Sequence, residues 1–252
     1  MFQKLKRFLR KRFWLTQIIE NQRKLLESNK GLLRFQQEQL KAIVFNNAIS
    51  GSQWLIHKNF TPGGWAADYA FLYTLYRVLN DMKPGKIIEF GLGQTSKMIH
   101  QYAKSHNDIN AITYEHNPEW VVFFYKSFEG GYSINIRYLQ LHTIEYKSVK
   151  TLSYKDFENE VGNQKFNLIV VDAPFESEHY SRSQVIKMVP NCLENSFCIL
   201  IDDYNRPGEK ETAHEICNIL DLNKIKYNSA IYSGIKDHFL ICSDDYYFLT
   251  SL

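Results

Sequence analysis

The sequence predicts an α/β protein with a mostly parallel sheet, helices on both faces, an antiparallel C-terminal hairpin and an N-terminal helical arm. Short apolar runs alternate with helical stretches from residue 86 onward. Two strand-like runs then follow each other closely around residue 235, and the first 48 residues have a helical pattern. Strands that alternate with helices are typical of a parallel, doubly wound sheet.

Length and composition limit the function classes. With 252 residues and 44% hydrophobic content, the chain can bury one sizeable core. We divide it into a helical arm, 1–48, and a catalytic-size domain, 49–252. A formal net charge of +3 is too small to indicate a nucleic-acid partner. No run approaches the roughly 18 consecutive apolar residues of a membrane span, and the cysteines form no close pair, so we expect a cytoplasmic protein with reduced thiols.

Residues 1–14 interleave lysines and arginines with apolar and aromatic side chains. Such a segment suits an anionic membrane surface, where the cations stay near the headgroups and the rings enter the interface. This interpretation places the protein peripherally at the inner membrane surface. The alternative is a helix whose apolar stripe packs on its own domain or on a partner chain.

From residue 15 to about 48 the helical pattern continues with a seven-residue repeat. The repeating apolar residues are Ile19, Leu26, Leu33 and Leu40, with Ile18, Leu25 and Leu32 beside them. A seven-residue repeat suits the seam of a coiled coil or of a helical hairpin, with residues 28–31 as the point of a break. We therefore expect this arm to support homo-oligomerisation.

The domain begins with turn residues over 60–65 and a predicted buried helix over 66–80. Strands are predicted over 86–90, 111–115, 134–140, 167–172 and 197–202, with helices or loops between them. The runs 226–232 and 237–242 are joined by a short turn, which predicts a hairpin at the edge of the sheet. Together these runs make seven strands.

The first predicted strand runs into a glycine turn, E-F-G-L-G over 89–93, and Thr95 then opens a helix. Glycines let a ligand approach the backbone, and a helix N-terminus completes a cradle for a nucleotide-like ligand. Acidic residues also close later strands, at Glu115, at Asp172 and at 202–203. Ligands of open α/β sheets lie at the carboxyl ends of the strands, so we expect these acids around one binding site.

The type of nucleoside follows from two of these acids. Glu115 is placed to accept hydrogen bonds from both ribose hydroxyls; the alternative is an acid that stabilises the N-terminus of a helix beginning near Pro118. A dinucleotide site needs a third glycine, but residue 96 is serine, and Glu89 disfavours a pyrophosphate. Glu89 instead favours a cationic amino-acid portion such as that of S-adenosylmethionine.

These residues resemble the class I S-adenosylmethionine-dependent methyltransferases. The family's first motif, E/D-x-G-x-G, is matched over 89–93, and its second-strand acid is matched by Glu115. The segments 166–174 and 199–209 resemble a subgroup with a D-A-P or D-G-P fourth strand and a D-D-x-x-R-x-x-E fifth strand. This neighbourhood includes macrocin-type sugar O-methyltransferases and plant glucuronoxylan O-methyltransferases. The resemblance covers about residues 60–245 and implies a Rossmann-like, seven-stranded sheet with an antiparallel last strand.

The resemblance also implies roles for single residues. The residues expected to hold S-adenosylmethionine are Glu89, Gly91, Gly93, Thr95, Glu115, His116 and Asp172, with Asn117 as an alternative neighbour of the adenine. The expected ligands of Mg²⁺ or another divalent cation are Asp172, Asp202 and Asp203. Alternatively, Asp172 borders the cofactor while Asp202 or Asp203 pairs with Arg206 or caps a helix.

Methyl transfer to a hydroxyl also needs a base and contacts to the acceptor. The candidate bases are Asp172, His179 and Asp203. The candidate acceptor contacts are Trp65, Arg182 and Arg206; for the two arginines the alternatives are salt bridges to Glu178 and Glu209. The sequence thus favours methyl transfer to an oxygen of a sugar, glycan or other small polar acceptor. The rival interpretations are an NAD-dependent oxidoreductase and a noncatalytic scaffold that its arm recruits to a membrane.

Overall fold

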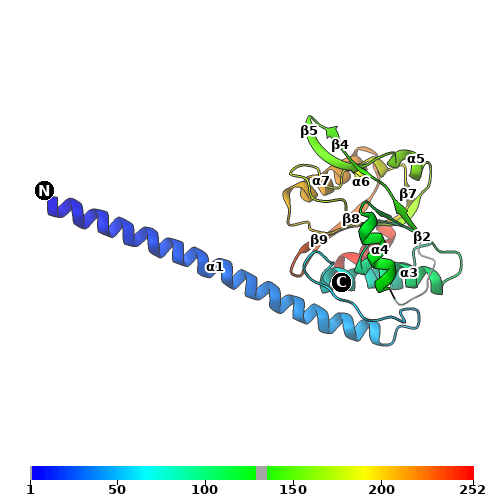
Figure 1. Cartoon of the computed structure of the whole chain (residues 1–252), viewed down its shortest axis with the longest axis horizontal. Helices are drawn as coiled ribbons and strands as arrows, with labels where there is room; N and C mark the ends of the chain where they lie inside the picture. Colours follow the sequence, from blue (N-terminus) through cyan, green and yellow to red (C-terminus); the bar gives the residue numbers. More distant parts are fainter. Residues whose placement is uncertain (1, 129–134) are drawn as a thin grey trace.

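The computed structural model describes the backbone of residues 2–128 and 135–252, and the side chains from residue 13 onward within these ranges. Figure 1 shows a rounded α/β domain from which one long helix projects. This helix, α1 (Phe2–Ser50), is continuous for 49 residues. The helical-hairpin alternative is therefore wrong, because a single exposed glycine such as Gly31 costs only about 1 kcal/mol, too little to break a long helix.

The C-terminal third of α1 packs on the domain. Phe45 and Ile49 are buried in a core that they share with α2 (Tyr69–Arg77). Glu38 accepts a hydrogen bond from the backbone N–H of Tyr69 at 2.6 Å. The arm expected over 1–48 is thus continuous with the core of the domain. Among the described residues, no helix combines the length and apolar character needed to cross a bilayer.

The remaining elements alternate along the chain. The strands are β1 (Lys86–Phe90), β2 (Asn110–Glu115), β3 (Ile136–Tyr138), β4 (Leu141–Tyr146), β5 (Val149–Tyr154), β6 (Phe166–Val171), β7 (Leu193–Ile201), β8 (Tyr227–Ser233) and β9 (Asp237–Ser243). The other helical segments are the π-helical η1 (Val78–Met82), α3 (Gln94–Ser105), α4 (Pro118–Ser127), α5 (Phe157–Val161), α6 (Gln184–Met188), α7 (Pro207–Leu222) and the 3-10 helical η2 (Asp244–Ser251).

Seven of these strands form one sheet in the order β3-β2-β1-β6-β7-β9-β8. Strands β1, β2, β3, β6 and β7 are parallel, and β9 runs antiparallel to both of its neighbours. The predicted mostly parallel sheet with a reversed last strand is confirmed. The chain leaves β1 toward one side of the sheet and β6 toward the other, so the crevice between these two strand ends is the switch point where ligands of such sheets bind.

Helices cover both faces of the sheet, as predicted. One face packs against the end of α1 with α2, η1, α3 and η2, and the other packs against α5, α6 and α7. Successive side chains of a strand point to opposite faces. In β6, for example, Leu168 and Val170 join the first core, whereas Ile169 and Val171 join the second. These strands are therefore apolar on both sides, which is why they show as continuous apolar runs.

Local structure differs from the prediction at three places. The helix expected over 66–80 begins at Tyr69, because Asp68 caps it by accepting the N–H of Phe71 at 2.9 Å. The strand expected over 134–140 is the short β3; residue 134 lies outside the described residues. The hairpin β4–β5 was not predicted, since its two-residue turn, with φ of 48° and 65°, consists of lysine and serine rather than the usual Asn-Gly.

Candidate active site

The carboxyl ends of β1, β2, β6 and β7 lie side by side and form what we call the strand-end rim: residues 91–93, 115–117, 172–174 and 202–204. Backbone hydrogen bonds hold these ends in register. The N–H of Gly91 donates to the carbonyl of Tyr114 at 2.9 Å, and the N–H of Asp172 donates to the carbonyl of Phe90 at 2.9 Å. The strand-end acids predicted from the sequence therefore share one edge of the sheet.

The two glycines of the turn after β1 serve different purposes. Gly91 has a φ of +100°, and a Cβ on it would lie 3.0 Å from the Cβ of Ala173 and 3.2 Å from the carbonyl carbon of Asp172. Gly91 is therefore required by the fold itself. Gly93 is extended, with a φ of −171°, and a Cβ there would meet no atom within 4 Å. Gly93 thus keeps open a space beside the turn that a ligand can fill.

Glu89 is the buried acid beneath this turn. Its side chain has no exposed surface, and its Oε2 accepts a hydrogen bond from the hydroxyl of Thr113 at 2.7 Å. Its Oε1 has no hydrogen-bond partner among the residues that the structure describes. Burial raises the pKa of Glu89 to about 7, against the lowering effect of the hydroxyls of Thr95, Thr113 and Ser96, which reach this carboxyl group. A buried carboxylate oxygen without a partner is costly, so this position favours a cationic ligand group.

Glu115 ties the end of β2 to the glycine turn. Its Oε2 accepts the N–H of Leu92 at 3.0 Å, and its Oε1 accepts the N–H groups of His116 at 2.7 Å and Asn117 at 2.8 Å. These contacts leave part of the acceptor capacity of a carboxylate unused, because its two oxygens offer about four lone pairs. The amide oxygen of Asn117 caps α4.

His116 and Phe175 flank the rim beyond Glu115. Their ring centroids are 4.4 Å apart in an edge-to-face arrangement, and burial lowers the pKa of His116. The two ring nitrogens of His116 have no hydrogen bond within the described part of the chain, although Nδ1 lies 3.1 Å from Oε1 of Glu115. A neutral ring of this kind can border a flat heterocycle.

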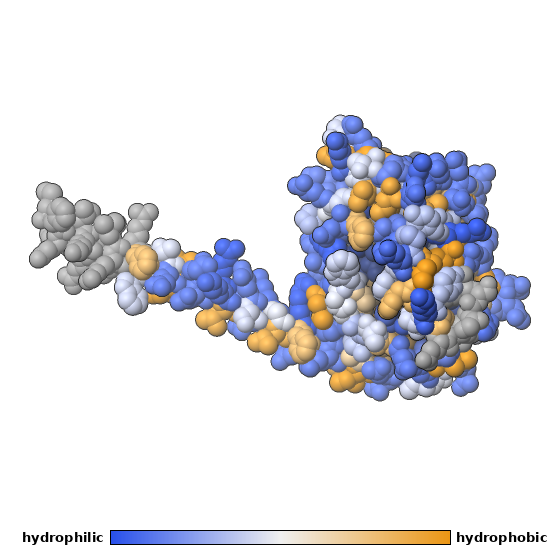
Figure 2. Space-filling view, viewed as in Figure 1, coloured by the Kyte–Doolittle hydropathy of each residue, from blue (hydrophilic) through white to orange (hydrophobic). Residues whose placement is uncertain are grey.

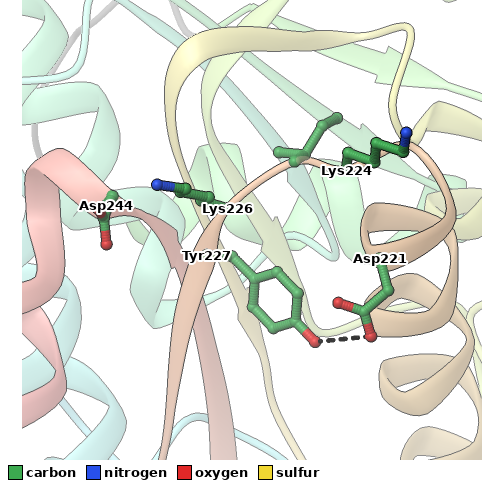
Figure 3. Close-up of a pocket in the computed structure, with 6 residues that line it drawn as sticks. Asp221, Lys224, Lys226, Tyr227 and Asp244 are labelled. Atoms are coloured by element: carbon green, nitrogen blue, oxygen red, sulfur yellow. Dashed lines mark hydrogen bonds between the residues drawn. The ribbon is translucent and has the colours of Figure 1, made fainter.

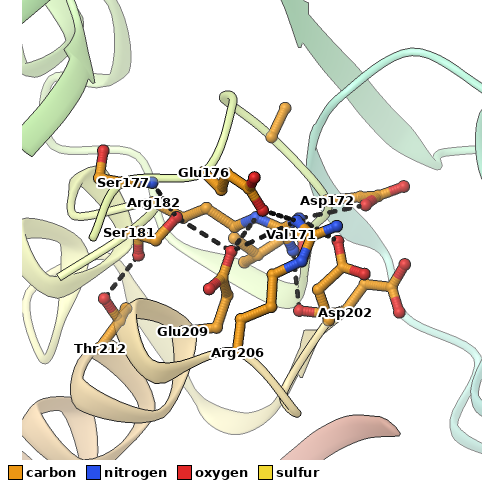
Figure 4. A network of polar contacts seen from close by, with 12 residues as sticks. Val171, Asp172, Glu176, Ser177, Ser181, Arg182, Asp202, Arg206, Glu209 and Thr212 are labelled. Atoms are coloured by element: carbon orange, nitrogen blue, oxygen red, sulfur yellow. Dashed lines mark hydrogen bonds and ion pairs between the residues drawn. The ribbon is translucent and has the colours of Figure 1, made fainter. Parts of the chain in front are cut away.

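Asp172, Asp202 and Asp203 come together at the other half of the rim, and one carboxylate oxygen of each lies within 4.8 Å of the others. We call these three residues the aspartate cluster. Figure 4 shows Asp172 and Asp202 with the arginines Arg182 and Arg206. Burial and the charge of Asp202 raise the pKa of Asp172 well above its ordinary value, although Arg182 opposes the shift. Oδ1 of Asp202 is buried and has no hydrogen-bond partner among the described residues. The cluster therefore offers the oxygen atoms that a further cation could use as ligands.

Arg182 holds the two strand ends together instead of facing the solvent. Its guanidinium donates to the carbonyls of Val171 at 3.0 Å and Asp202 at 2.8 Å, and to the carboxylate of Asp203 at 2.7 Å. Only 2% of its side chain is exposed. The sequence analysis predicted that Arg182 contacts the acceptor or, alternatively, forms a salt bridge to Glu178. In the structure Arg182 lies among buried groups at the strand ends, because two adjacent carboxyl ends present several unpaired hydrogen-bond acceptors.

Arg206 and Lys236 complete the counter-charge of the aspartate cluster. Arg206 lies 3.1 Å from Asp203, which is the pairing raised as an alternative above, and 3.0 Å from Glu176. Lys236 lies 2.9 Å from Asp202. Burial alone would lower the pKa of Lys236, but the aspartates of the cluster raise this pKa above its ordinary value.

His179 and Trp65 lie apart from these contacts. His179 pairs with Glu211 of α7 at 3.0 Å, and this carboxylate raises the pKa of the histidine. Nearly half of the His179 side chain is exposed, and no contact with the aspartate cluster is present among the described residues. Trp65 is 90% exposed. His179 therefore stays a predicted base and Trp65 a predicted acceptor contact, with no direct link to the cluster among the described residues.

Three contacts at the candidate site involve residues that the sequence analysis did not name. Lys236 reaches the rim because β9 inserts beside β7, which brings the β8–β9 turn to this edge; the predicted hairpin was the available signal. His100 lies 2.9 Å from the hydroxyl of Thr113 and so supports the partner of Glu89. The indole N–H of Trp120 donates to the carbonyl of Leu92 at 2.6 Å, which fixes the glycine turn to α4.

A separate hollow lies where α7 leads into β8 (Figure 3) and is lined by Asp221, Lys224, Ile225, Lys226, Tyr227 and Asp244. Tyr227 begins β8, so this hollow is at the amino end of that strand, away from the strand-end rim. None of the predicted site residues lines it. The hollow therefore contributes nothing to the candidate site.

Comparisons with known proteins support the fold. No protein-family model and no curated protein matches the chain. A presumed O-methyltransferase from Klebsiella pneumoniae has a TM-score of 0.51 at 15% identity, over 82% of this chain and 99% of that one. A cofactor-bound protein from MTB has a TM-score of 0.50 at 11% identity, over 82% of this chain and 97% of that one. At these identities the likeness shows a shared α/β fold, and the chemistry has to be argued from the strand-end rim.

Proposed function

We propose that this protein is an S-adenosylmethionine-dependent methyltransferase that acts on an oxygen of a sugar, a glycan or another small polar acceptor. The observation that carries the proposal is Glu89, a fully buried carboxylate with an unpartnered oxygen beneath a glycine turn at the switch point of the sheet. The ammonium group of the cofactor's amino-acid end satisfies such an oxygen, whereas a pyrophosphate would be repelled by it. The fold shared with a presumed O-methyltransferase supports oxygen as the acceptor atom.

The rest of the rim fits the same cofactor. Gly93 leaves open space beside the turn, and Glu115 retains about one of its four lone pairs for a ribose hydroxyl. The rings of His116 and Phe175 form a border of the right kind for the adenine. Asp172 follows β6, which lies between β1 and β7, whereas the other two members of the cluster follow β7, so Asp172 can contact both cofactor and acceptor.

The bound cofactor supplies a methyl group on a sulfonium, and the protein supplies alignment and removal of the hydroxyl proton. Asp172 is the base that the geometry favours, because its ion pair in the described part of the chain, with Arg182, is long at 3.5 Å. Asp203 is already paired with Arg182 and Arg206, and His179 with Glu211. Arg206 is about one-third exposed and can hold a polar or anionic acceptor beside the cluster.

The aspartate cluster also fits a divalent cation. Three carboxylates within 4.8 Å offer oxygen-only ligands, which suit Mg²⁺ or Mn²⁺, and Oδ1 of Asp202 lacks a partner in the described structure. Bound there, the ion would supply a positive charge beside an acceptor oxygen. Arg182, Arg206 and Lys236 already lie against the cluster, and their charges are the alternative to a metal.

Chelation tests this assignment. We expect excess EDTA to suppress methyl transfer and added Mg²⁺ or Mn²⁺ to restore it, because three carboxylate oxygens within 4.8 Å of one another offer the oxygen-only ligands of such an ion. Asp202→Asn should reproduce the loss, with the fold checked by circular dichroism. Full turnover in excess chelator would show that Arg182, Arg206 and Lys236 balance the charge of the cluster without a metal ion.

Calorimetry with S-adenosylhomocysteine and with NAD tests the cofactor. We expect the homocysteine compound to bind and NAD not to bind. Because an ionised Glu89 attracts the ligand's ammonium and its pKa is about 7, affinity should fall as the pH drops below 7, by up to roughly tenfold per pH unit. Below pH 7 the carboxyl group of Glu89 must lose a proton before it can attract the ammonium group of the ligand.

Glu89→Gln provides the control, since it keeps the shape of the side chain and removes its charge. This variant should bind S-adenosylhomocysteine weakly at every pH and should lose the Glu89-dependent step in the pH profile. Tight NAD binding without S-adenosylhomocysteine binding would support the oxidoreductase instead. Binding of neither compound would support the scaffold with a vestigial pocket.

A further inference from the structure

Aliphatic side chains recur on one side of α1 along the part that projects from the domain, and Figure 2 shows orange patches between hydrophilic residues on the arm. We call these side chains the arm stripe; its members are Leu15, Ile18, Ile19, Leu25, Leu26, Leu32, Leu33, Leu40 and Ile43. Each of these residues is between 49% and 62% exposed. So many exposed aliphatic side chains on one helix mark a surface that is buried in an assembly.

The arm stripe faces away from the protein's own domain. Successive residues of a helix are rotated by about 100°, which places the arm stripe on the side opposite the domain-contacting residues Glu38, Phe45 and Ile49. Leu40 and Ile43 stay about 60% exposed even though the helix is packed on the domain at this point. The domain therefore cannot cover the arm stripe, and the occupant has to be another molecule.

Amide side chains lie along the centre line of the arm stripe. Gln22, Asn29 and Gln36 recur every seven residues between the pairs of aliphatic residues, and all three are exposed. In a coiled-coil heptad they occupy position a, and the aliphatic pairs occupy positions d and e. Against lipid, each amide would lose its hydrogen bonds, which is costly. In a parallel, in-register pair of identical helices, each amide meets its own counterpart and bonds to it.

Charge and area agree with self-pairing. Residues 13–33 carry three basic and two acidic side chains, and Arg23–Glu27 (3.2 Å) and Lys24–Glu20 (4.0 Å) pair within the helix. Two copies therefore do not repel each other strongly, and this stretch lacks the cationic face of a membrane-surface helix. At about 100 Å² for each aliphatic side chain, two copies can bury on the order of 1,000 Å², the area of a specific interface.

We propose that the arm stripe pairs with the arm stripe of a second copy of this chain in a parallel, in-register, two-stranded coiled coil. The seven-residue spacing gives such a pair a left-handed supercoil. Because each domain packs on the side of α1 opposite the stripe, the two domains lie on the outer sides of the pair. This proposal is independent of the methyltransferase assignment.

Light scattering after size-exclusion chromatography of the full chain tests the pairing. We expect the wild-type mass to be twice the 29.7 kDa of one chain at micromolar concentration. The double variant Leu25→Glu/Leu32→Glu should be monomeric, because four carboxylates would enter the interface. The matched variant Gln17→Glu/Ser28→Glu adds the same charge off the stripe and should stay dimeric. A monomeric wild type, or a dimeric Leu25→Glu/Leu32→Glu variant, would overturn the proposal.

Disulfide trapping tests the register. Gln22→Cys should cross-link two chains under mild oxidation, since equivalent a positions face each other in a parallel pair. Gln17→Cys and the wild type should not cross-link. Absence of cross-linking at position 22 contradicts the in-register arrangement. A wild type that is monomeric in solution and binds phosphatidylserine-containing vesicles would show that the arm stripe contacts a membrane. Membrane contact is the alternative raised for residues 1–14; the side chains of residues 1–12 lie outside the described part of the structure.

Discussion

Gly91→Ala is expected to destabilise the protein by about 3 kcal/mol and to abolish cofactor binding. A φ of +100° is unfavourable for alanine, and the new Cβ would lie 3.0 Å from the Cβ of Ala173. Backbone strain of this kind costs about 1–3 kcal/mol, and overpacking adds about 1–3 kcal/mol. Thermal unfolding of the purified variant should show a melting temperature lower by about 6–12 °C, given about 2–4 °C for each kcal/mol at this chain length.

Gly93→Ala is the matched control for this prediction. Its backbone is extended and nothing lies within 4 Å of the added methyl group, so the unfolding free energy should stay within about 0.5 kcal/mol of the wild type. The methyl group would instead fill the space beside the turn and lower the affinity for S-adenosylhomocysteine at least roughly tenfold. If Gly93→Ala keeps full affinity, the ligand does not approach the turn, and the proposed cofactor position is wrong.

Asp172→Asn is expected to lower kcat about 10²- to 10⁴-fold, the usual contribution of a general base. The amide keeps the shape of the side chain but cannot accept the hydroxyl proton. In the wild type, kcat should rise with pH through an apparent pKa above the ordinary aspartate value of 3.8, because burial raises the pKa of Asp172. The measurement is transfer of labelled methyl from S-adenosylmethionine across a panel of glycans and small polar metabolites.

His179→Gln separates the two candidate bases. This histidine is partly exposed and is paired with Glu211, so its replacement should change kcat less than about threefold. A large loss in His179→Gln together with near-normal turnover in Asp172→Asn would reverse the assignment. Loss of S-adenosylhomocysteine affinity in Asp172→Asn without loss of kcat would instead limit Asp172 to holding the cofactor.

The order of elements could be predicted from the sequence because it depends on local patterns. The apolar run before Gly91, the acids at the strand ends and the closing hairpin are each visible within a few residues, and the sheet confirms them. The β4–β5 hairpin escaped prediction because its turn lacks the residues that usually adopt positive φ. The sequence also did not decide whether α1 is continuous or broken near Gly31, since a residue pattern does not compare the small cost of one exposed glycine with the stability of a long helix.

By itself the sequence determined the fold class, the glycine turn and the acidic residues that close the strands. Only the tertiary structure decided what those acids contact. Thr113 reaches Glu89 across 24 positions, Arg182 reaches Asp203 across 21, and Lys236 reaches Asp202 across 34. Such partners are set by strand order and burial, which no local pattern contains. The unpartnered oxygen of Glu89 and the opposite faces of α1 became visible for the same reason: both are defined by what the rest of the folded chain leaves uncovered.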